Sequence, residues 1–349
     1  MIEKSNINTL VVGGTGFLGG AIVDALAEKG YSVTVLSRGS TSRQLPDGVK
    51  IITADRHGDL SALQGRSFNW VFDTCAFTPD AVSTLLDALT NKIDRYVFAS
   101  SISTYGRYEI PGLTEAVEVA DATQDDLDRA AAVPNSDRGS AAAYGASYGP
   151  LKRACERLAD ERLNDRATAL RIGLIVGQGD YTDRLTWWVR RIDEAGRSKS
   201  YKVASPLPAD RPVQILDVRD AAEFAVVCTE EGLGGIWNVN GEIIPMRDLL
   251  DAIRYATGSR GELQWISADA FTQAGAEPWT DVPLMIPDIP AFRHFLEVDA
   301  SRARASGLKA RPLLETLQPL LNWDRSRRNV ELICGLSVEK EEKAKAASS

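Results

Sequence analysis

The chain has 349 residues, of which 44% are apolar and 25% charged, as in ordinary globular proteins. This length allows one large α/β domain or two unequal domains. The net charge of -8 argues against a nucleic-acid partner, because binding to phosphates normally requires a basic face. A small anionic ligand stays possible, since a few arginines or backbone amides are enough to hold one.

Cysteine and histidine usage argues against a metal site and a disulfide framework. The four cysteines are far apart and form no C-x-x-C pair, so each is expected to pack as a small apolar side chain in a reducing compartment. Only two histidines are present, and we expect no metal. The sequence shows neither a basic leader followed by an apolar stretch nor an apolar run of roughly 18 residues. We therefore expect a cytoplasmic protein without membrane contact.

The first 175 residues alternate short apolar runs with amphipathic runs. This alternation is typical of an α/β fold in which helices cover a parallel sheet. The expected strands are Thr9–Gly13, Ser32–Leu36, Lys50–Ala54, Asn69–Thr74, Arg95–Ser100 and Ala167–Val176, and the expected helices are Phe17–Lys29, Ala81–Leu89 and Leu151–Leu163.

The pattern becomes irregular after Gly177. Six of the seven tryptophans lie beyond residue 180, which favours a second, smaller lobe with many loops. We expect a dinucleotide-binding domain over residues 1–177, joined by a strand and helix from about 213–240, and a mainly substrate-binding lobe over 178–335. Residues 336–349 mix charge with Ala and Ser without a core-facing period, and we expect a disordered tail.

A glycine-rich turn lies between the first expected strand and the first expected helix, with the spacing Gly13-x-x-Gly16-x-x-Gly19. Small residues let the backbone turn sharply and approach a pyrophosphate, and free N–H groups at the helix start supply donors. A glycine triplet by itself also suits a tight turn without a ligand. The strand and helix around it favour a dinucleotide turn, and hence a doubly wound sheet of the Rossmann type.

The residues after the second strand bear on the choice of cofactor. An acidic side chain at this place accepts hydrogen bonds from the ribose 2′-OH of NAD and repels a 2′-phosphate. This chain has Ser37 and Arg38 instead, and a guanidinium suits a 2′-phosphate or can stack on adenine. An exposed surface arginine is the alternative explanation. The charge favours NADP, with NAD as the other possibility.

Tyr148 is the only one of nine tyrosines with a lysine four residues later, Lys152. At a helix start the two side chains point the same way, and a nearby ammonium would lower the pKa of the phenol. Such a phenol can exchange a proton with a hydroxyl or carbonyl. Ser101, at the end of the fifth strand, could hold the substrate oxygen in line with Tyr148. Serines at a strand end are also ordinary turn or cap residues.

Several motifs in the same order resemble the extended short-chain dehydrogenase/reductases, the group of NAD-dependent epimerases and dehydratases. The resemblance covers about residues 8–325. It is carried by Gly13-Gly14-Thr15-Gly16-Phe17-Leu18-Gly19, Ser100-Ser101-Ile102-Ser103-Thr104-Tyr105-Gly106, Tyr148-x-x-x-Lys152, Leu170-Arg171-Ile172-Gly173-Leu174-Ile175-Val176-Gly177 and Val213-Gln214-Ile215-Leu216-Asp217-Val218-Arg219-Asp220.

The resemblance implies a role for each matching residue. Tyr148 would be the acid/base, Lys152 would hold the nicotinamide ribose and lower the tyrosine pKa, and Ser101 would orient the substrate. Asp55 would contact adenine. The residues expected around the cofactor are Gly13, Thr15, Gly16, Phe17, Leu18, Gly19, Ser37, Arg38, Asp55, Arg56, Thr74, Cys75, Ala76, Phe77, Tyr148, Lys152 and Gly173.

Two departures from the family pattern narrow the reaction. The NAD-using epimerases usually carry Asp after strand two, where this chain has Ser37-Arg38. The Thr/Ser-Asp-Glu series of the sugar-nucleotide dehydratases is absent, because Ile102-Ser103 follows Ser101. Dehydration by that mechanism is therefore disfavoured, while reduction, oxidation and epimerisation through a ketone stay open.

The leading hypothesis is an oxidoreductase or epimerase acting on a secondary alcohol or ketone of a sugar-like substrate or nucleotide sugar. A dinucleotide-sensing regulator and an RNA-binding relative of the fold are the alternatives; the intact Ser101, Tyr148 and Lys152 argue against the first, and the acidic charge against the second. The resemblance also implies a homodimer formed by the helices near 81–89 and 151–163. Arg184, Arg190 and Arg191 surround Trp187-Trp188 and could meet a phosphate, although a solvated basic helix face is the simpler interpretation.

Overall fold

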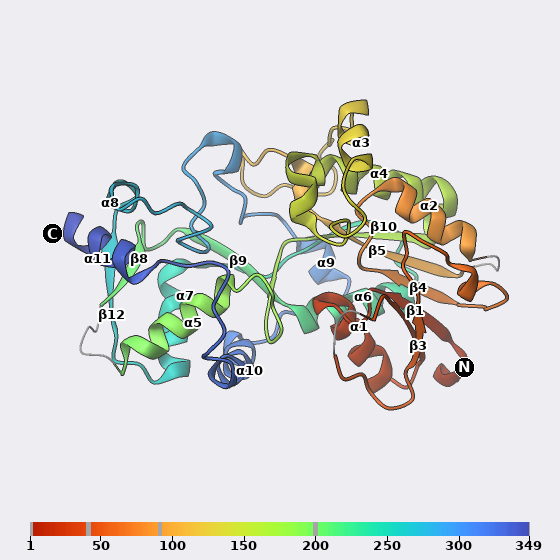
Figure 1. Cartoon of the computed structure of the whole chain (residues 1–349), viewed down its shortest axis with the longest axis horizontal. Helices are drawn as coiled ribbons and strands as arrows, with labels where there is room; N and C mark the ends of the chain where they lie inside the picture. The colour runs from red at the N-terminus through yellow and green to blue at the C-terminus, as the bar shows by residue number, and fades with distance from the viewer. Residues whose placement is uncertain (1–2, 40–42, 90–92, 198–201, 349) are drawn as a thin grey trace.

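The computed structural model describes residues 3–39, 43–89, 93–197 and 202–348. Its chain forms two lobes, one built on a large sheet and the other on helices and short strands (Figure 1). The described N-terminal residues lie in the first lobe, and the C-terminal residues lie at the far end of the second (Figure 1).

The first lobe is built on a seven-stranded sheet in which all paired strands are parallel. The chain proceeds outward from β1 (Asn8–Val12) through its neighbour β2 to β3 (Lys50–Thr53) at one edge. It then returns to β4 (Trp70–Asp73), which pairs with the other side of β1. In such a sheet a ligand binds beyond the carboxyl ends of the strands where the order reverses, here β1 and β4. In spatial order the strands are β10 (Gly235–Val239), β6 (Ala167–Ile172), β5 (Arg95–Ser101), β4 (Trp70–Asp73), β1 (Asn8–Val12), β2 (Ser32–Ser37) and β3 (Lys50–Thr53).

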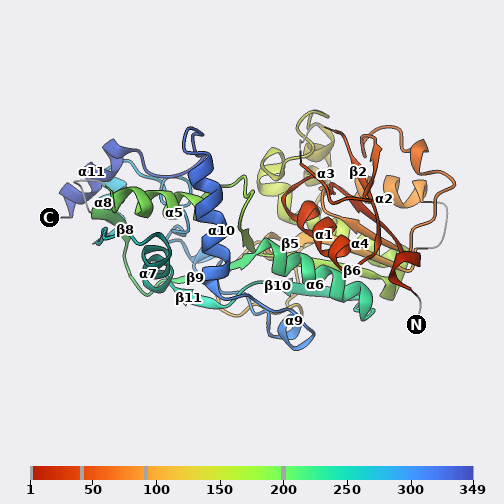
Figure 2. The ribbon, with the colours of Figure 1, turned by 90° about the horizontal axis from the view of Figure 1, so that it is seen from below.

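Helices cover both faces of this sheet, which confirms the predicted doubly wound α/β fold. Helix α1 (Phe17–Glu28) packs beside α6 (Val218–Glu230) on one face (Figure 2), and α2 (Pro79–Ala88) packs beside α4 (Tyr148–Leu163) on the other. Both faces of the sheet are buried, so successive residues of β1 are apolar. Val11 packs in the core under α1 and α6, and Leu10 packs in the core under α2 and α4.

The second lobe has its own apolar core. Helices α5 (Arg184–Ala195), α7 (Met246–Thr257) and α10 (Leu313–Ser326) pack against one another. The rings of Trp187 and Trp188 meet edge to face within this core. Residues 213–240 cross back to the first lobe, where they supply α6 and β10. The remaining elements are α3 (Gln124–Ala131), β7 (Leu174–Val176), α5 (Arg184–Ala195), β8 (Lys202–Pro206), β9 (Pro212–Asp217), β11 (Ile243–Pro245), α7 (Met246–Thr257), β12 (Glu262–Ile266), α8 (Ala268–Gln273), α9 (Ser301–Ala305), α10 (Leu313–Ser326) and α11 (Val338–Ala347).

The expected sixth strand over residues 167–176 is wrong as a single strand. It breaks at Gly173 into β6, which stays in the large sheet, and β7, which pairs with β9 in a three-stranded sheet. The backbone passes so close to Asn240 at the break that a Cβ on Gly173 would lie 1.7 Å from the Asn240 side-chain oxygen. The chain leaves the first lobe at this point.

The expected disordered tail is a helix over most of its length. Helix α11 packs on α8, β8 and β12, and Ala344 is fully buried there. The buried Glu341 carboxylate accepts hydrogen bonds from the backbone N–H of Ala204 at 3.0 Å and from Arg191 at 2.7 Å. These distant partners fix the segment, and its charged composition does not reveal them.

The interpretation of Arg190 and Arg191 as a solvated helix face is also wrong. Arg190 donates to the buried carboxylate of Asp324 at 2.7 Å, and Arg191 binds Glu341 as described above. Both guanidinium groups therefore join α5 to C-terminal segments and are not available to a phosphate.

No helix in the described ranges combines the length and the apolar character that crossing a bilayer requires. The four cysteines are free thiols. Within the same ranges, no three His, Cys, Asp or Glu side chains gather in a way that could hold a metal ion.

Candidate active site

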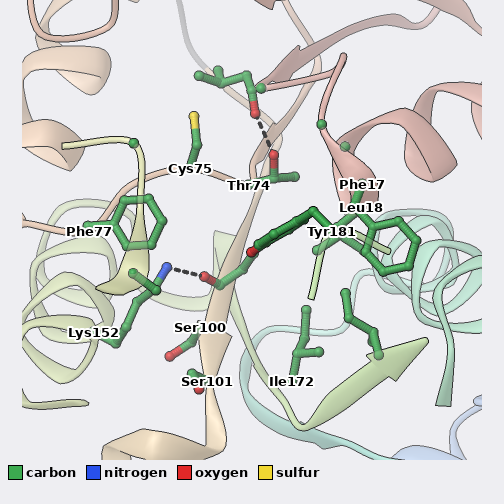
Figure 3. Close-up of a pocket in the computed structure, with 18 of the residues that line it drawn as sticks. Phe17, Leu18, Thr74, Cys75, Phe77, Ser100, Ser101, Lys152, Ile172 and Tyr181 are labelled. Carbon is green, nitrogen blue, oxygen red and sulfur yellow. Dashed lines mark hydrogen bonds between the residues drawn. The ribbon is translucent and has the colours of Figure 1, made fainter. Parts of the chain in front are cut away.

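A cavity of about 570 Å³ lies beyond the carboxyl ends of the central strands and extends to the loop after β7. Figure 3 shows its walls: Phe17 and Leu18 on one side, Thr74, Cys75 and Phe77 on another, and Ser100, Ser101 and Lys152 on a third. Residues expected from the sequence that line it are Gly13, Thr15, Gly16, Phe17, Leu18, Gly19, Ser37, Arg38, Asp55, Arg56, Thr74, Cys75, Phe77, Ser101, Tyr148, Lys152 and Gly173.

The glycine turn at the floor of the cavity requires glycine at positions 13 and 19. Gly13 has a left-handed backbone, with a φ of +80°, and a Cβ on Gly19 would lie 2.2 Å from the carbonyl oxygen of Gly13. Helix α1 then begins at Phe17, and no described side chain caps it. The first N–H groups of the helix are therefore free to meet an anion, so the turn fits the pyrophosphate of a dinucleotide.

The ends of β2 and β3 form one end of the cavity. The hydroxyl groups of Thr15 and Ser37 lie 3.0 Å apart in a hydrogen bond that ties the glycine turn to the end of β2. The half-buried Asp55 carboxylate accepts the backbone N–H of His57 at 3.0 Å. Arg38 is exposed and lines the cavity beside Asp55. This end therefore offers both a cation and a carboxylate to a nucleoside.

Arg56 and Ala76 both make contacts within the protein at the cavity wall. Arg56 lines the cavity; its guanidinium is buried in an ion pair with Asp73 and donates to the carbonyl of Ala81 at 2.7 Å, while its Nε has no partner among the described residues. Ala76 is fully buried and does not line the cavity, and its carbonyl accepts from Lys152. Ala76 therefore supports the wall from behind, whereas Arg56 forms part of its surface.

Tyr148 and Lys152 share one face at the start of α4, as their spacing predicts. The helix start packs so tightly on the segment after β5 that a Cβ on Gly149 would lie 2.1 Å from the carbonyl oxygen of Ser103. This close approach brings Tyr148 next to Ser101, whose hydroxyl accepts the backbone N–H of Ser103 at 3.1 Å. The glycine after the tyrosine is a signal that the sequence reasoning missed.

Lys152 is buried at the base of this pair. Its Nζ donates to the carbonyl oxygens of Ala76 and Ala99, each at 2.7 Å, and lies 4.7 Å from the centroid of the Phe77 ring (Figure 3). Burial lowers the pKa of the ammonium to about 8. The charge is thus fixed by carbonyl oxygens from two strand ends.

The expected lowering of the tyrosine pKa is wrong for this structure. Burial raises the pKa of Tyr148 to about 12, and the hydrogen bond with Ser101 offsets only part of that effect. The Lys152 ammonium lies 5.8 Å from the centroid of the Tyr148 ring, and it does not reverse the effect of burial. The phenol therefore keeps its proton at neutral pH.

A buried ion pair lies directly behind the tyrosine–lysine pair. Glu156 of α4 binds Arg171 of β6 through two hydrogen bonds of 2.8 and 3.0 Å, and it accepts the Ser100 hydroxyl at 2.6 Å. Both charged side chains are 1% exposed. This pair links α4 to the ends of β5 and β6. Arg171 belongs to one of the motifs that carry the family resemblance. Its ion pair with Glu156 could not be predicted, because no local sequence pattern indicates which residue a buried arginine meets.

The second lobe closes the far end of the cavity with residues of which the sequence singled out only Arg184, as one that could meet a phosphate. Asp180, Tyr181, Thr182 and Arg184 come from the loop after β7 and the start of α5, and Trp279 and Phe295 come from later segments. The available signal was the Gly177-x-Gly179-Asp180 turn at a strand end, which is where parallel sheets place ligands.

Comparison with known families and sequences supports the reading of the glycine turn. Residues 9–83 match the NAD dependent epimerase/dehydratase family. The chain is also 29% identical over 133 residues to the 2'-dehydrokanamycin reductase of Streptomyces kanamyceticus, an alignment that covers 37% of this chain and 37% of that protein. The similarity thus spans well under two thirds of the relative.

Comparison with solved structures extends the likeness to the whole fold. UDP-N-acetylglucosamine 4-epimerase from Methanobrevibacter ruminantium M1 has a TM-score of 0.66 at 19% identity, covering 93% of this chain and 99% of that one. The enzyme of the same name from Bacillus cereus has a TM-score of 0.65 at 17% identity, covering 94% and 99%. At such identities the match establishes the fold alone.

Proposed function

We propose that this chain, whose residues 9–83 match the NAD dependent epimerase/dehydratase family, is an NAD(P)-dependent oxidoreductase that interconverts a secondary alcohol and a ketone on a sugar-like substrate. The observation that carries this proposal is that Ser101, Tyr148 and Lys152 line the same cavity as the glycine turn. The reductase name of the S. kanamyceticus relative supports net reduction over epimerisation.

The glycine turn and the first N–H groups of α1 would hold the pyrophosphate of the cofactor, and Ser37, Arg38 and Asp55 would flank its adenosine. Hydride exchange with the substrate carbon is the chemistry that a nicotinamide cofactor supplies when bound.

The side chains supply the proton and the positioning. Tyr148 keeps its proton at neutral pH because burial raises the pKa of its phenol to about 12, so it suits the donation of a proton to a substrate oxygen. In the direction of reduction, Tyr148 would donate its proton to the carbonyl oxygen of the substrate, and solvent would then restore the proton. Ser101 would orient that oxygen, and the buried Lys152 charge would stabilise the phenolate that forms.

Arg38 supports a preference for NADP, because its exposed guanidinium at the end of β2 can pair with a 2′-phosphate. Replacing Arg38 with Ala should weaken NADPH binding by about tenfold, since losing one charge-assisted contact costs about 1.5 kcal/mol. NADH binding should change little. Fluorescence titration of both cofactors checks this, and an equal loss for both would count against the preference.

Transfer of deuterium tests the proposed function. The wild-type protein would be incubated with 4-deuterated NADPH and a panel of cyclic ketones derived from sugars, and the products analysed by mass spectrometry. We expect one deuterium on the carbinol carbon of the product. The corresponding alcohols, incubated with the protein and NADP⁺, would reveal an epimerase if their configuration inverts without net reduction of the cofactor. No reaction with any member of either panel would contradict the proposal.

A further inference from the structure

The loop between β7 and α5 turns back into the cavity. Gly177 and Gly179 have left-handed backbones, with φ of +138° and +91°, and the N–H of Asp180 donates to the carbonyl of Gly177 at 3.1 Å. This tight turn places Asp180, Tyr181 and Thr182 in the cavity wall. Figure 3 shows Tyr181 inside the cavity, between the Phe17 and Leu18 side and the end of β5 with Ser100 and Ser101.

Asp180 has a buried carboxylate oxygen without a partner among the described residues. Its side chain is 1% exposed, and one oxygen accepts the backbone N–H of Thr182 at 2.7 Å. The other oxygen, Oδ2, makes no hydrogen bond with any residue that the structure describes. Buried carboxylate oxygens are normally paired, because desolvation without a hydrogen bond is costly. An acceptor of this kind in the lining of a cavity is suited to a ligand that donates a hydrogen bond.

Thr182 and Arg184, which follow Asp180 in the chain, also have buried polar atoms without hydrogen-bond partners among the described residues. These atoms are the Thr182 hydroxyl and the Arg184 Nε. Both residues line the same cavity as Asp180. One acceptor, one hydroxyl and one donor thus gather at the end of the cavity that the second lobe provides.

An aromatic surface completes this end. The Arg184 guanidinium lies 4.6 Å from the centroid of the Trp279 ring, and Phe295 meets Trp279 edge to face at 5.6 Å. A flat aromatic surface beside a few fixed polar atoms is the usual way in which proteins hold a small ring. The combination suits a saturated ring whose substituents donate and accept hydrogen bonds.

We propose that Asp180 is the substrate-anchoring residue, whose free oxygen accepts a hydrogen bond from a hydroxyl or ammonium group on a saturated ring packed against Trp279. This proposal deepens the proposed function and rests on it, since the ring is the substrate of that reaction. A carboxylate repels a phosphate, so the diphosphate of a nucleotide sugar is disfavoured beside Asp180. The anchoring group is therefore a donor on the ring itself.

Binding measurements separate this proposal from catalysis. The protein loaded with NADP⁺ would be titrated by ligand-observed NMR with three probes: methyl glucoside, its 2-amino-2-deoxy counterpart and UDP-glucose. Wild type, Asp180→Ala and Asp180→Asn would be compared, with Asp248→Asn as a matched control because Asp248 is exposed at the start of α7. The affinity for NADP⁺ shows that each variant is folded.

We expect Asp180→Ala to weaken binding of the monosaccharide that wild type prefers by about tenfold or more, which corresponds to the loss of a hydrogen bond to a charged group. Asp180→Asn keeps an acceptor oxygen, so it should weaken the amino probe strongly if an ammonium is the anchor and spare the methyl glucoside if a hydroxyl is. Asp248→Asn should match wild type.

Two results would overturn the proposal: monosaccharide binding that Asp180→Ala leaves unchanged, or failure of both monosaccharides to bind wild type, whether or not UDP-glucose binds. Binding that depends on Asp180 in a protein that transfers no deuterium would instead contradict the proposed function and leave the anchoring site standing.

Discussion

The two walls of the cavity differ in how their polar groups are satisfied. On the wall from the first lobe, the Lys152 ammonium donates to two carbonyls and the Thr15 and Ser37 hydroxyls bind each other. On the wall from the second lobe, Asp180 and Arg184 present buried polar atoms without partners among the described residues. On the first wall only the Nε of Arg56 lacks a partner among the described residues, whereas the second wall leaves buried polar atoms of Asp180, Thr182 and Arg184 for a ligand to pair with. We infer that the first wall performs the chemistry and the second chooses the substrate.

The largest expected effect on stability comes from breaking the support of the first wall. Glu156→Ala leaves the guanidinium of Arg171 buried without its counter-ion, which should lower the free energy of unfolding by about 3–5 kcal/mol. Glu161→Ala is a matched control, because Glu161 lies on the same helix in an exposed ion pair with Arg157 and should cost less than about 0.5 kcal/mol. Urea unfolding of the three proteins measures both values, and equal losses would contradict the internal support.

On the second wall, removing the charge of Asp180 should raise the free energy of unfolding, and the size of this gain should depend on pH. Burial raises the pKa of Asp180 from 3.8 to about 6, with the hydrogen bond from the Thr182 backbone N–H offsetting part of the effect. Well below pH 4 the carboxyl is protonated in both the folded and the unfolded state. Between about pH 4 and pH 6 it ionises in the unfolded state and stays protonated in the folded state, so the folded state loses about 3 kcal/mol of stability over this range.

Asp180→Asn removes this titration. The variant without ligand should therefore gain stability over wild type between pH 4 and pH 7, by up to about 3 kcal/mol. Unfolding in urea at several pH values tests the expectation. If the difference in free energy of unfolding between variant and wild type does not change with pH, the Asp180 carboxylate already has its hydrogen-bond partners. That result would contradict the proposed difference between the two walls.

Much of the first wall could be predicted from the sequence, because its signals are local. The Gly13-x-x-Gly16-x-x-Gly19 turn lies between a buried strand and a helix, and Tyr148 and Lys152 are one helical turn apart. Both patterns reflect geometry within a single segment. The Gly173 break was missed because a strand that changes sheets keeps the same apolar pattern on both sides.

The second wall could not be predicted, because its residues meet through tertiary contacts. Asp180 and Trp279 are far apart in the sequence, and they line one cavity only because the second lobe folds against the first. The same reason explains the tail: the burial of Glu341 depends on Arg191 and the backbone of Ala204, which no local period reveals. Charge composition alone therefore suggested disorder.

The catalytic role of Tyr148 is the central claim, and replacing it with Phe tests that role most directly because only the hydroxyl is lost. The rate of NADPH oxidation with the best ketone of the panel should fall by about 10³-fold, while NADPH affinity stays unchanged. Tyr255→Phe, at an exposed tyrosine of α7, should match wild type. A Tyr148→Phe variant that oxidises NADPH at the wild-type rate would contradict the account.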